Sequence, residues 1–260
     1  MMGLGYSEET ARTCDIRGCY EFTPRVHGNT TGAGHINMLK PIELVFNNGT
    51  DPATGFRCEC GAEPLENIHS FDDFYTAYLK YLNNIIETIV LCANDFEQYL
   101  HLINPAQLYS ITIENSLKTA RDAFSDGNVY NNTSILCAGL GTAVDALMAV
   151  REFVFRKREL TLAGFRDILL RNWEGHEKLR LRILRSRKRY GNGDAGADRY
   201  AAALGHFLGA KLNLRPNARG GFYEASGHSA RTFIRLGEKT GATPDGRRAG
   251  EEMSKNISPA

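Results

Sequence analysis

The feature that most constrains the fold is a long segment with helical periodicity that begins at Ser70. Ser70–Asp73 resembles a capping box, the arrangement that starts many helices. Large apolar residues then recur at helical spacing, at Phe74, Tyr78, Leu82, Ile85, Ile89 and Phe96. This pattern predicts an amphipathic helix, broken at most once, that runs to Asn104. Pro105 permits a restart, and a second helical segment is expected to reach Phe124.

The segments around these helices differ in character. The first 70 residues are rich in Gly, Asn, Thr and Pro, which predicts loops with strand or short-helix fragments. Gly139–Phe155 has the small and large apolar residues of a closely packed helix, and Leu162–Arg189 resembles an amphipathic helix with a strongly basic polar face. A strand over Gly220–Gly227 and a turn-dense loop over Thr240–Ala249 follow. No repeat or low-complexity linker is found, so a single domain, or part of one, is expected.

Composition argues against several classes of partner. Lys and Arg number 31 against 30 Asp and Glu, so no charge excess indicates binding to nucleic acid or to an anionic membrane. No stretch approaches the ~18 apolar residues of a membrane helix, and the first residues lack the features of a secretory signal. We therefore expect a cytoplasmic protein that acts on a small molecule. Its cysteines are interpreted as thiols of a reducing compartment, with Cys92 and Cys137 as core residues on apolar helical patterns.

The segment richest in chemistry is Arg17–Phe22, which contains Cys19 and Glu21 beside a flexible glycine. A thiol two residues from a carboxylate places a nucleophile or radical close to a base. The residues alone leave a second interpretation open, in which Cys19 is a buried small hydrophobe and Glu21 an exposed loop acid. A cysteine-protease arrangement would need His27 or His35 as partner, but no nucleophile motif surrounds Cys19.

The residues around Cys19 match a known motif. Gly18–Glu21 spells G-C-Y-E, and Gly28 and the pattern N-x-x-K-x-x-E-L from Asn37 follow it. Further blocks come in the expected order, at Tyr130–Asn132, Gly139–Leu147, Tyr190–Asn192 and Thr243–Glu251. Over nearly its whole length the sequence resembles the glycyl radical enzymes of the pyruvate formate-lyase type.

This resemblance implies an α/β fold in which residues 1–260 form a helix-rich, incomplete portion of a ten-stranded barrel. It implies a cysteine loop at about 15–37, a helical region at 70–208, and a strand with a T-P-D-G-R loop at 218–260. It also implies that Cys19 carries a thiyl radical that abstracts a substrate hydrogen, while Glu21 acts as general base. Sulfur suits the role, because an S–H bond is close in strength to an activated C–H bond.

The resemblance further implies a radical stored on a C-terminal glycine and installed by a radical S-adenosylmethionine activase. The complete R-V-x-G-[YF] motif that carries this glycine is not found here. Arg25–Asn29 matches four of its five positions but lacks the aromatic residue, so it is not interpreted as the radical site. We therefore expect that the N-terminal part of the barrel and the C-terminal glycyl radical domain are absent, that this chain itself binds no cofactor, and that the isolated chain is inactive. The full-length enzyme is expected to be a homodimer, in the cytoplasm or inside a bacterial microcompartment.

Gly18 stands where pyruvate formate-lyase has a second cysteine. This favours a lyase or dehydratase that cleaves a C–O, C–N, C–S or C–C bond of a small polar substrate. The alternatives are a formate C-acetyltransferase variant and a non-catalytic fragment that needs other chains. His27 and His35 are candidate substrate contacts, with surface or capping roles as the alternative.

Cys58-Glu59-Cys60 offers two metal ligands. A zinc site needs four ligands, however, and only His69 lies close in sequence. No metal site is therefore predicted.

Overall fold

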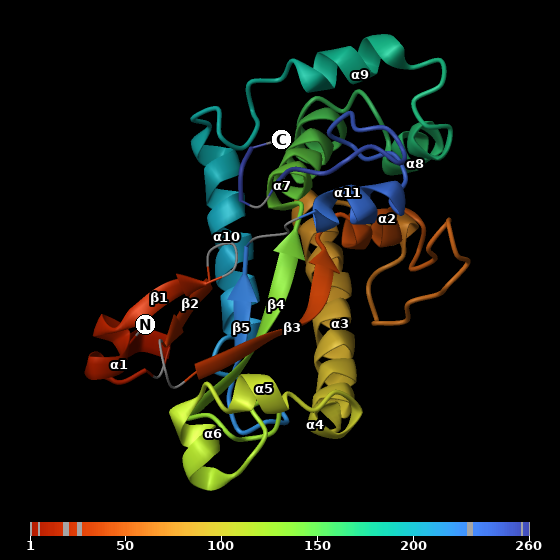
Figure 1. The fold of residues 1–260 in the computed structure, drawn as a ribbon. Coiled ribbons are helices and arrows are strands. Elements are labelled where there is room, and N and C mark those ends of the chain that lie inside the picture. Colours follow the sequence, from red (N-terminus) through yellow and green to blue (C-terminus); the bar gives the residue numbers. More distant parts are fainter. Residues whose placement is uncertain are drawn as a thin grey trace. The chain divides into compact units, whose positions relative to one another are not determined.

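A computed structural model describes residues 2–4, 6–17, 21–24, 28–227, 231–255 and 257–259. The chain separates into two compact units, each assembled from three stretches of sequence. The first unit comprises Met1–His35, Ile86–Leu136 and Phe207–His228, and the second comprises Ile36–Ile85, Cys137–His206 and Ser229–Ala260. Figure 1 shows their helices and strands in sequence colours.

The first unit begins with the 3-10 turn η1 (Met2–Leu4) and the short helix α1 (Glu8–Arg12). An antiparallel hairpin follows, formed by β1 (Cys14–Arg17) and β2 (Glu21–Pro24). A separate three-stranded sheet has the order β3 (Gly28–Asn37), β4 (Tyr130–Ala138), β5 (Tyr223–Ser226), as Figure 1 shows. Strands β4 and β5 pair in parallel, with Thr133 opposite Tyr223.

Strand β3 occupies the last part of the segment 15–37, in which the resemblance places the cysteine loop. This glycine-rich stretch is extended for ten residues. A Cβ atom added at Gly34 would lie 2.7 Å from Cγ2 of Ile89. The glycine is therefore needed for close packing of the strand against a helix, and the same residue type that indicated a loop permits the strand here.

The long helix α3 (Phe71–Glu97) confirms the predicted start and the single break. The amide of Asp73 donates to Oγ of Ser70 at 3.1 Å, and the amide of Ser70 donates back to the Asp73 carboxylate at 2.8 Å. A second helix, α4 (Leu100–Ile103), follows the break. The predicted apolar stripe is wrong at its end, because Phe96 is 52% exposed whereas the neighbouring Glu97 is 1% exposed.

Two other predicted helices are shorter than expected. The segment after Pro105 contains only α5 (Gln107–Ser110) and α6 (Glu114–Thr119), and α6 ends where Ala120 adopts a left-handed conformation. The single basic helix expected over Leu162–Arg189 is instead α8 (Leu162–Leu170) and α9 (Glu177–Leu184). Asn172 and Trp173 both have positive φ angles, which stop the first helix before the second begins.

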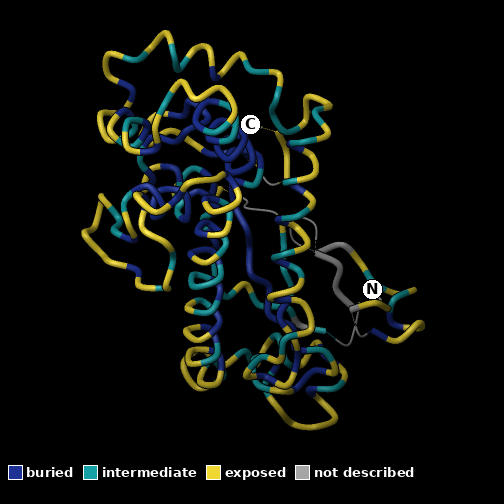
Figure 2. The backbone as a smooth tube through the Cα atoms, turned by 180° about the vertical axis from the view of Figure 1, so that it is seen from behind, coloured by how far each residue is buried: buried dark blue, intermediate teal, exposed yellow. Residues whose placement is uncertain are grey.

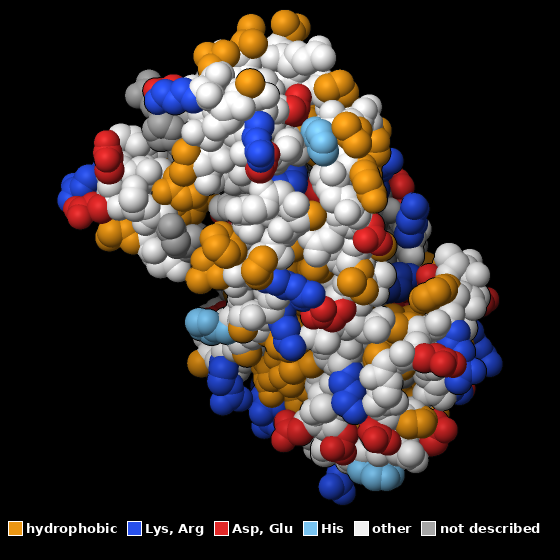
Figure 3. Space-filling model, turned by 90° about the horizontal axis from the view of Figure 1, so that it is seen from below, with side chains coloured by type: hydrophobic (Ala, Val, Ile, Leu, Met, Phe, Trp, Pro, Cys, Tyr) orange, Lys and Arg blue, Asp and Glu red, His pale blue; other side chains and the backbone are white. Residues whose placement is uncertain are grey.

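The region of α4 to α6 presents apolar side chains to solvent. Figure 3, viewed from the side where these helices lie in Figure 1, shows hydrophobic side chains among the charged ones. The exposed large hydrophobic residues from these helices and their ends include Tyr99, Leu102, Ile103, Leu108, Ile111 and Leu117. The predicted core position of Cys92 is also wrong, because this residue is exposed on α3, whereas Cys137 is buried, on β4 instead of a helix.

The second unit is built around α7 (Leu140–Val150), in which every residue from Gly141 onward is buried. The π-helix η3 (Arg151–Arg156) continues it, so the predicted close-packed segment is confirmed. Figure 2 shows buried residues in dark blue. The remaining elements of this unit are α2 (Lys40–Phe46), η2 (Leu65–Asn67), most of α10 (Ala195–Leu212) and α11 (Thr232–Glu238).

Candidate functional site

The hairpin β1–β2 carries the predicted catalytic segment. Arg17 of β1 pairs with Glu21 of β2, so residues 18–20 connect the two strands in sequence. Cys19 and His27 lie outside the described residues, and Glu21 is described only in its backbone. His35 is described and lies exposed on β3. The structure therefore gives the strand framework of the predicted site, and the roles of these four residues stay predictions.

A polar cluster in the same unit joins the segment before the hairpin to the sheet. The Tyr6 hydroxyl donates to Oε1 of Glu224 on β5 at 2.8 Å, and the Asn132 side-chain amide on β4 donates to the Tyr6 oxygen at 2.6 Å. The Tyr6 ring packs against Tyr130 with centroids 4.7 Å apart. Burial, and then the negative charge of Glu224, raise the pKa of Tyr6, so the phenol remains a hydrogen-bond donor. The sequence block Tyr130–Asn132 thus anchors the N-terminal segment.

A buried ion pair lies in the same unit. Nε of Arg219 is 3.4 Å from Oε2 of Glu97, and both side chains are 1% exposed. Glu97 also accepts hydrogen bonds from Oγ1 of Thr133, at 2.6 Å, and from Thr31. Nη2 of Arg219 donates to the carbonyl of Asn132 at 2.7 Å and to Thr31 at 2.9 Å. Four separate stretches of the chain therefore meet at this pair.

Arg219 retains unused donors. Its Nε and Nη1 have no hydrogen-bond partner among the described residues, although Nε is near the Glu97 carboxylate. Burial lowers the pKa of Arg219 more strongly than Glu97 raises it. An open hollow of about 530 Å³ lies beside Glu97, with Thr31, Glu97 and Tyr109 in its wall. The hollow combines an apolar lining with a buried carboxylate on its wall.

Sequence reasoning missed this centre, although Arg219-Gly220-Gly221 carries a signal for it. A Cβ atom at Gly221 would lie 2.3 Å from the carbonyl oxygen of Asn131, so only glycine fits. Asn217 also contributes, because its side-chain amide donates to the same carbonyl at 2.6 Å. A glycine pair after an arginine thus marks a close backbone approach to β4.

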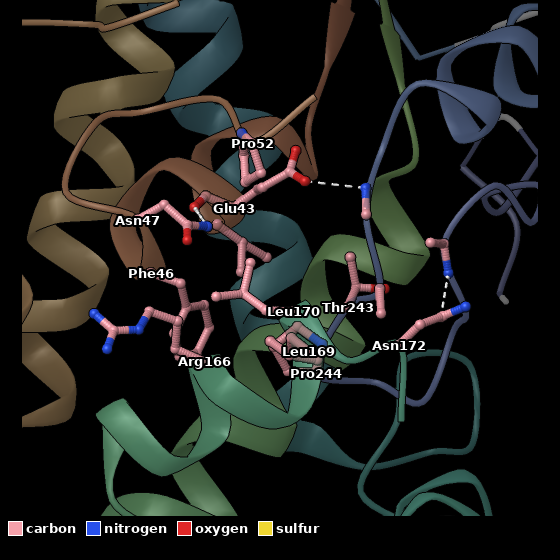
Figure 4. Close-up of a pocket in the computed structure, with 14 residues that line it drawn as sticks. Glu43, Phe46, Asn47, Pro52, Arg166, Leu169, Leu170, Asn172, Thr243 and Pro244 are labelled. Atoms are coloured by element: carbon pink, nitrogen blue, oxygen red, sulfur yellow. Dashed lines mark hydrogen bonds between the residues drawn. The ribbon is translucent and has the colours of Figure 1, made fainter. Parts of the chain in front are cut away.

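In the second unit, the N-x-x-K-x-x-E-L block has a clear structural role. Oδ1 of Asn37 accepts from the amides of Leu39, at 3.0 Å, and Lys40, at 3.2 Å, at the start of α2. The Lys40 ammonium pairs with Glu43 and lies 3.2 Å from Asp51. The other oxygen of Glu43 accepts from the Gly241 amide at 3.0 Å, as the dashed line in Figure 4 shows. This block therefore secures the loop that carries T-P-D-G-R-R.

Glu43 lies at the edge of a small pocket in this unit, of about 140 Å³, drawn in Figure 4. Its wall is mostly apolar, with Phe46 from α2, Leu169 and Leu170 at the end of α8, and Pro244 from the loop. Because both carboxylate oxygens of Glu43 are used by Lys40 and Gly241, the pocket lacks an available charged group at that position.

The T-P-D-G-R-R loop is held by the buried Arg247. Its guanidinium donates to Oγ1 of Thr243 at 3.2 Å and to the carbonyls of Thr240, at 3.1 Å, Glu251, at 2.6 Å, and Gly241. Trp173 donates through Nε1 to the Arg247 carbonyl at 3.2 Å. These contacts make the loop a rigid structural element.

Asp145 of α7 connects two further sequence blocks. Its Oδ1 accepts from the amide of Tyr190 at 2.8 Å, and Nη2 of Arg189 lies 2.9 Å from Oδ2 without hydrogen-bond alignment. Burial raises the pKa of Asp145 to about 6, and this effect exceeds the opposing effect of Arg189. Asp245, wholly buried nearby, also raises it.

Within the described part of the chain, no group of three or more His, Cys, Asp or Glu side chains is arranged to hold a metal ion. Among those residues there is likewise no helix long and apolar enough to cross a bilayer.

Comparisons with known proteins agree with the fold. A family profile described as pyruvate formate lyase-like matches residues 1–237. The trans-4-hydroxy-L-proline dehydratase of Clostridioides difficile is 28% identical over the whole chain, and the (2S)-3-sulfopropanediol dehydratase of Klebsiella oxytoca is 27% identical over the whole chain. The chain spans 33% and 32% of these relatives, about a third of their length.

A solved structure described by its 1,2-propanediol dehydration in Roseburia inulinivorans superposes with a TM-score of 0.90 at 28% identity. The alignment covers 100% of this chain and 33% of that protein. The predicted α/β class is thereby confirmed, together with its status as an incomplete part of the larger fold. From the profile match, the chain belongs to the pyruvate formate lyase-like family, which confirms the relationship to glycyl radical enzymes that its G-C-Y-E segment predicts.

Proposed function

We propose that this chain supplies the cysteine-bearing segment of a glycyl radical lyase or dehydratase that acts on a small polar substrate. The observation that supports this proposal most directly is the G-C-Y-E sequence at the hairpin β1–β2. The pairing of Arg17 with Glu21 leaves three residues to connect the two strands. The relatives named above include dehydratases of hydroxyproline and of a sulfonated diol. A hydroxylated substrate that loses water fits both this group of relatives and the general base expected at Glu21.

In this proposal Cys19 exchanges a hydrogen atom with the substrate carbon, and Glu21 takes the proton of the substrate hydroxyl as the neighbouring bond breaks. A radical on a backbone glycine, installed by a radical S-adenosylmethionine activase, supplies the initial unpaired electron. His27 and His35 are proposed to contact the substrate. Hydrogen transfer requires the thiol and the substrate C–H to be held in register.

The first test uses Cys19→Ala in the anaerobically activated holoenzyme. Turnover should be lost while the glycyl radical signal in electron paramagnetic resonance persists, because the cysteine acts after the radical store. Wild-type holoenzyme prepared in parallel is the control. Product formation by the alanine variant above the background without activase would refute the role of Cys19.

The second test uses Glu21→Gln. General bases contribute roughly 10²–10⁴-fold to rate, so elimination should slow by that order while exchange of substrate hydrogen through the thiol continues. If the Glu21→Gln variant lost hydrogen exchange as well as elimination, a role of Glu21 limited to proton transfer would be contradicted.

Two alternatives give different outcomes in the same preparation. A formate C-acetyltransferase variant would release formate from pyruvate in a reaction that depends on coenzyme A. A non-catalytic fragment would show no radical-dependent product with any hydroxylated substrate, even when the glycyl radical is present.

A further inference from the structure

A pair of cysteines outside the proposed catalytic segment has its own distinct environment. Cys58 is buried and Cys60 is partly exposed, and both cysteines line the same hollow. Sγ of Cys58 also donates to Oδ1 of Asn84 on α3 at 3.1 Å. The cysteines are two positions apart, and the shared hollow shows that the loop turns both residues to the same side.

The backbone holds this arrangement at both ends. The amide of Cys58 donates to the carbonyl of Gly49 at 2.8 Å, and a Cβ atom at Gly49 would lie only 2.5 Å from the Cys58 carbonyl oxygen. Thr50 and Arg57 form an isolated antiparallel bridge beside this contact. On the other side, the Lys80 ammonium donates to the Gly61 carbonyl at 2.8 Å. The thiol pair therefore lies on a fixed backbone.

The pair also lines a space that a small reagent can enter. An open hollow of about 340 Å³ has both cysteines, Tyr81 and Glu66 in its wall. Metal coordination is not favoured, because no third His, Cys, Asp or Glu ligand joins the two thiols among the described residues. Two close thiols without a third ligand are suited instead to formation of a disulfide bond.

We propose that Cys58 and Cys60 are a thiol–disulfide exchange site, which forms an intrachain disulfide with a small-molecule disulfide as oxidant. In the first step, the Cys60 sulfur attacks the reagent, forms a mixed disulfide and releases one small thiol. In the second step, the Cys58 sulfur attacks the Cys60 sulfur and releases the other small thiol. The protein gives up two electrons and two protons, and the reagent becomes two thiols.

The two cysteines differ in a way that fixes this order. Cys60 is partly exposed, whereas Cys58 is only 8% exposed and its thiol donates to Asn84. Burial also raises the pKa of Cys58 to about 11, which keeps it as a thiol near neutral pH. Cys58 is therefore a poor first nucleophile and acts second, as the resolving residue. Its thiolate attacks a Cys60 sulfur only two residues away, where proximity within one chain compensates for the low fraction of thiolate.

The experiment treats the purified chain with oxidised glutathione and analyses tryptic peptides by mass spectrometry without reduction. Cleavage after Arg57 and Lys80 leaves both cysteines on one peptide with no other cysteine. The expected product is that peptide lighter by two hydrogens and free of glutathione. The exposed Cys92 lies on a different peptide, and its reaction with glutathione shows that the reagent is active in the same sample.

Two single substitutions test the order of attack. Cys58→Ser should leave a stable glutathione adduct on Cys60, because the resolving thiol is gone. Cys60→Ser should leave Cys58 unmodified on the same time scale, because it is shielded. The proposal is overturned if the wild-type peptide accumulates glutathione adducts in place of the internal disulfide, or if both serine variants react alike. Trp173 fluorescence of each variant checks that the chain remains folded.

Discussion

Replacing Arg247 with alanine should destabilise the second unit far more than replacing its neighbour Arg248. The substitution leaves the carbonyls of Gly241 and Glu251 without their hydrogen-bond donor. The Thr240 carbonyl also loses Arg247 but still accepts from the Gly250 amide at 3.2 Å. Each carbonyl left without a donor costs about 1–3 kcal/mol. Two such carbonyls give an expected loss of about 4 kcal/mol in the free energy of unfolding.

The measurement is urea unfolding followed by the fluorescence of Trp173, the one tryptophan of the chain. Its indole donates to the Arg247 carbonyl, so the signal reports on this loop. Arg248→Ala is the matched control, because its side chain is 45% exposed and pairs at 2.9 Å with a half-exposed Glu177. Exposed pairs contribute about 0–1 kcal/mol. Equal losses for the two variants, or a loss below about 1 kcal/mol for Arg247→Ala, would show that the carbonyl contacts of Arg247 do not stabilise the loop.

Two further predictions concern buried positions. The folded-state pKa of Asp145, about 6, is above the reference value of 3.8, so the stability contributed by its protonated form is full below 3.8 and is lost as pH rises through 6. Between roughly pH 4 and 7, unfolding curves should show wild type losing about 3 kcal/mol relative to Asp145→Asn, and a constant difference would contradict this. Gly221→Ala should cost more than about 2 kcal/mol, because its Cβ meets the Asn131 carbonyl. Gly220→Ala, with open space and a φ of +75°, should cost about 1 kcal/mol, and the reverse order would reject the steric explanation.

The sequence predictions succeed where an element depends on residues close together in the chain, and they fail where it depends on residues far apart in the chain. The start of α3 depends on Ser70 and Asp73, which are three residues apart, so the local pattern identifies it. The division between α8 and α9 depends on Trp173, whose ring packs on Phe165 and whose indole reaches Arg247. Asn172 and Gly175, both at positive φ, are local stop signals, but the burial of Trp173 against residues remote in sequence is not visible in the local pattern.

For the site, the family, the order of its motifs and the candidate roles of Cys19 and Glu21 could be inferred from the sequence, because they depend on residue identity along the chain. Only the tertiary structure decided that Glu97 is buried beside Arg219, with the adjacent Phe96 in solvent. The helical periodicity of the sequence instead favours a buried Phe96 and an exposed Glu97. The buried carboxylate is accommodated because Thr31, Thr133 and Arg219, which are remote from it in sequence, supply its hydrogen-bond donors and its opposite charge.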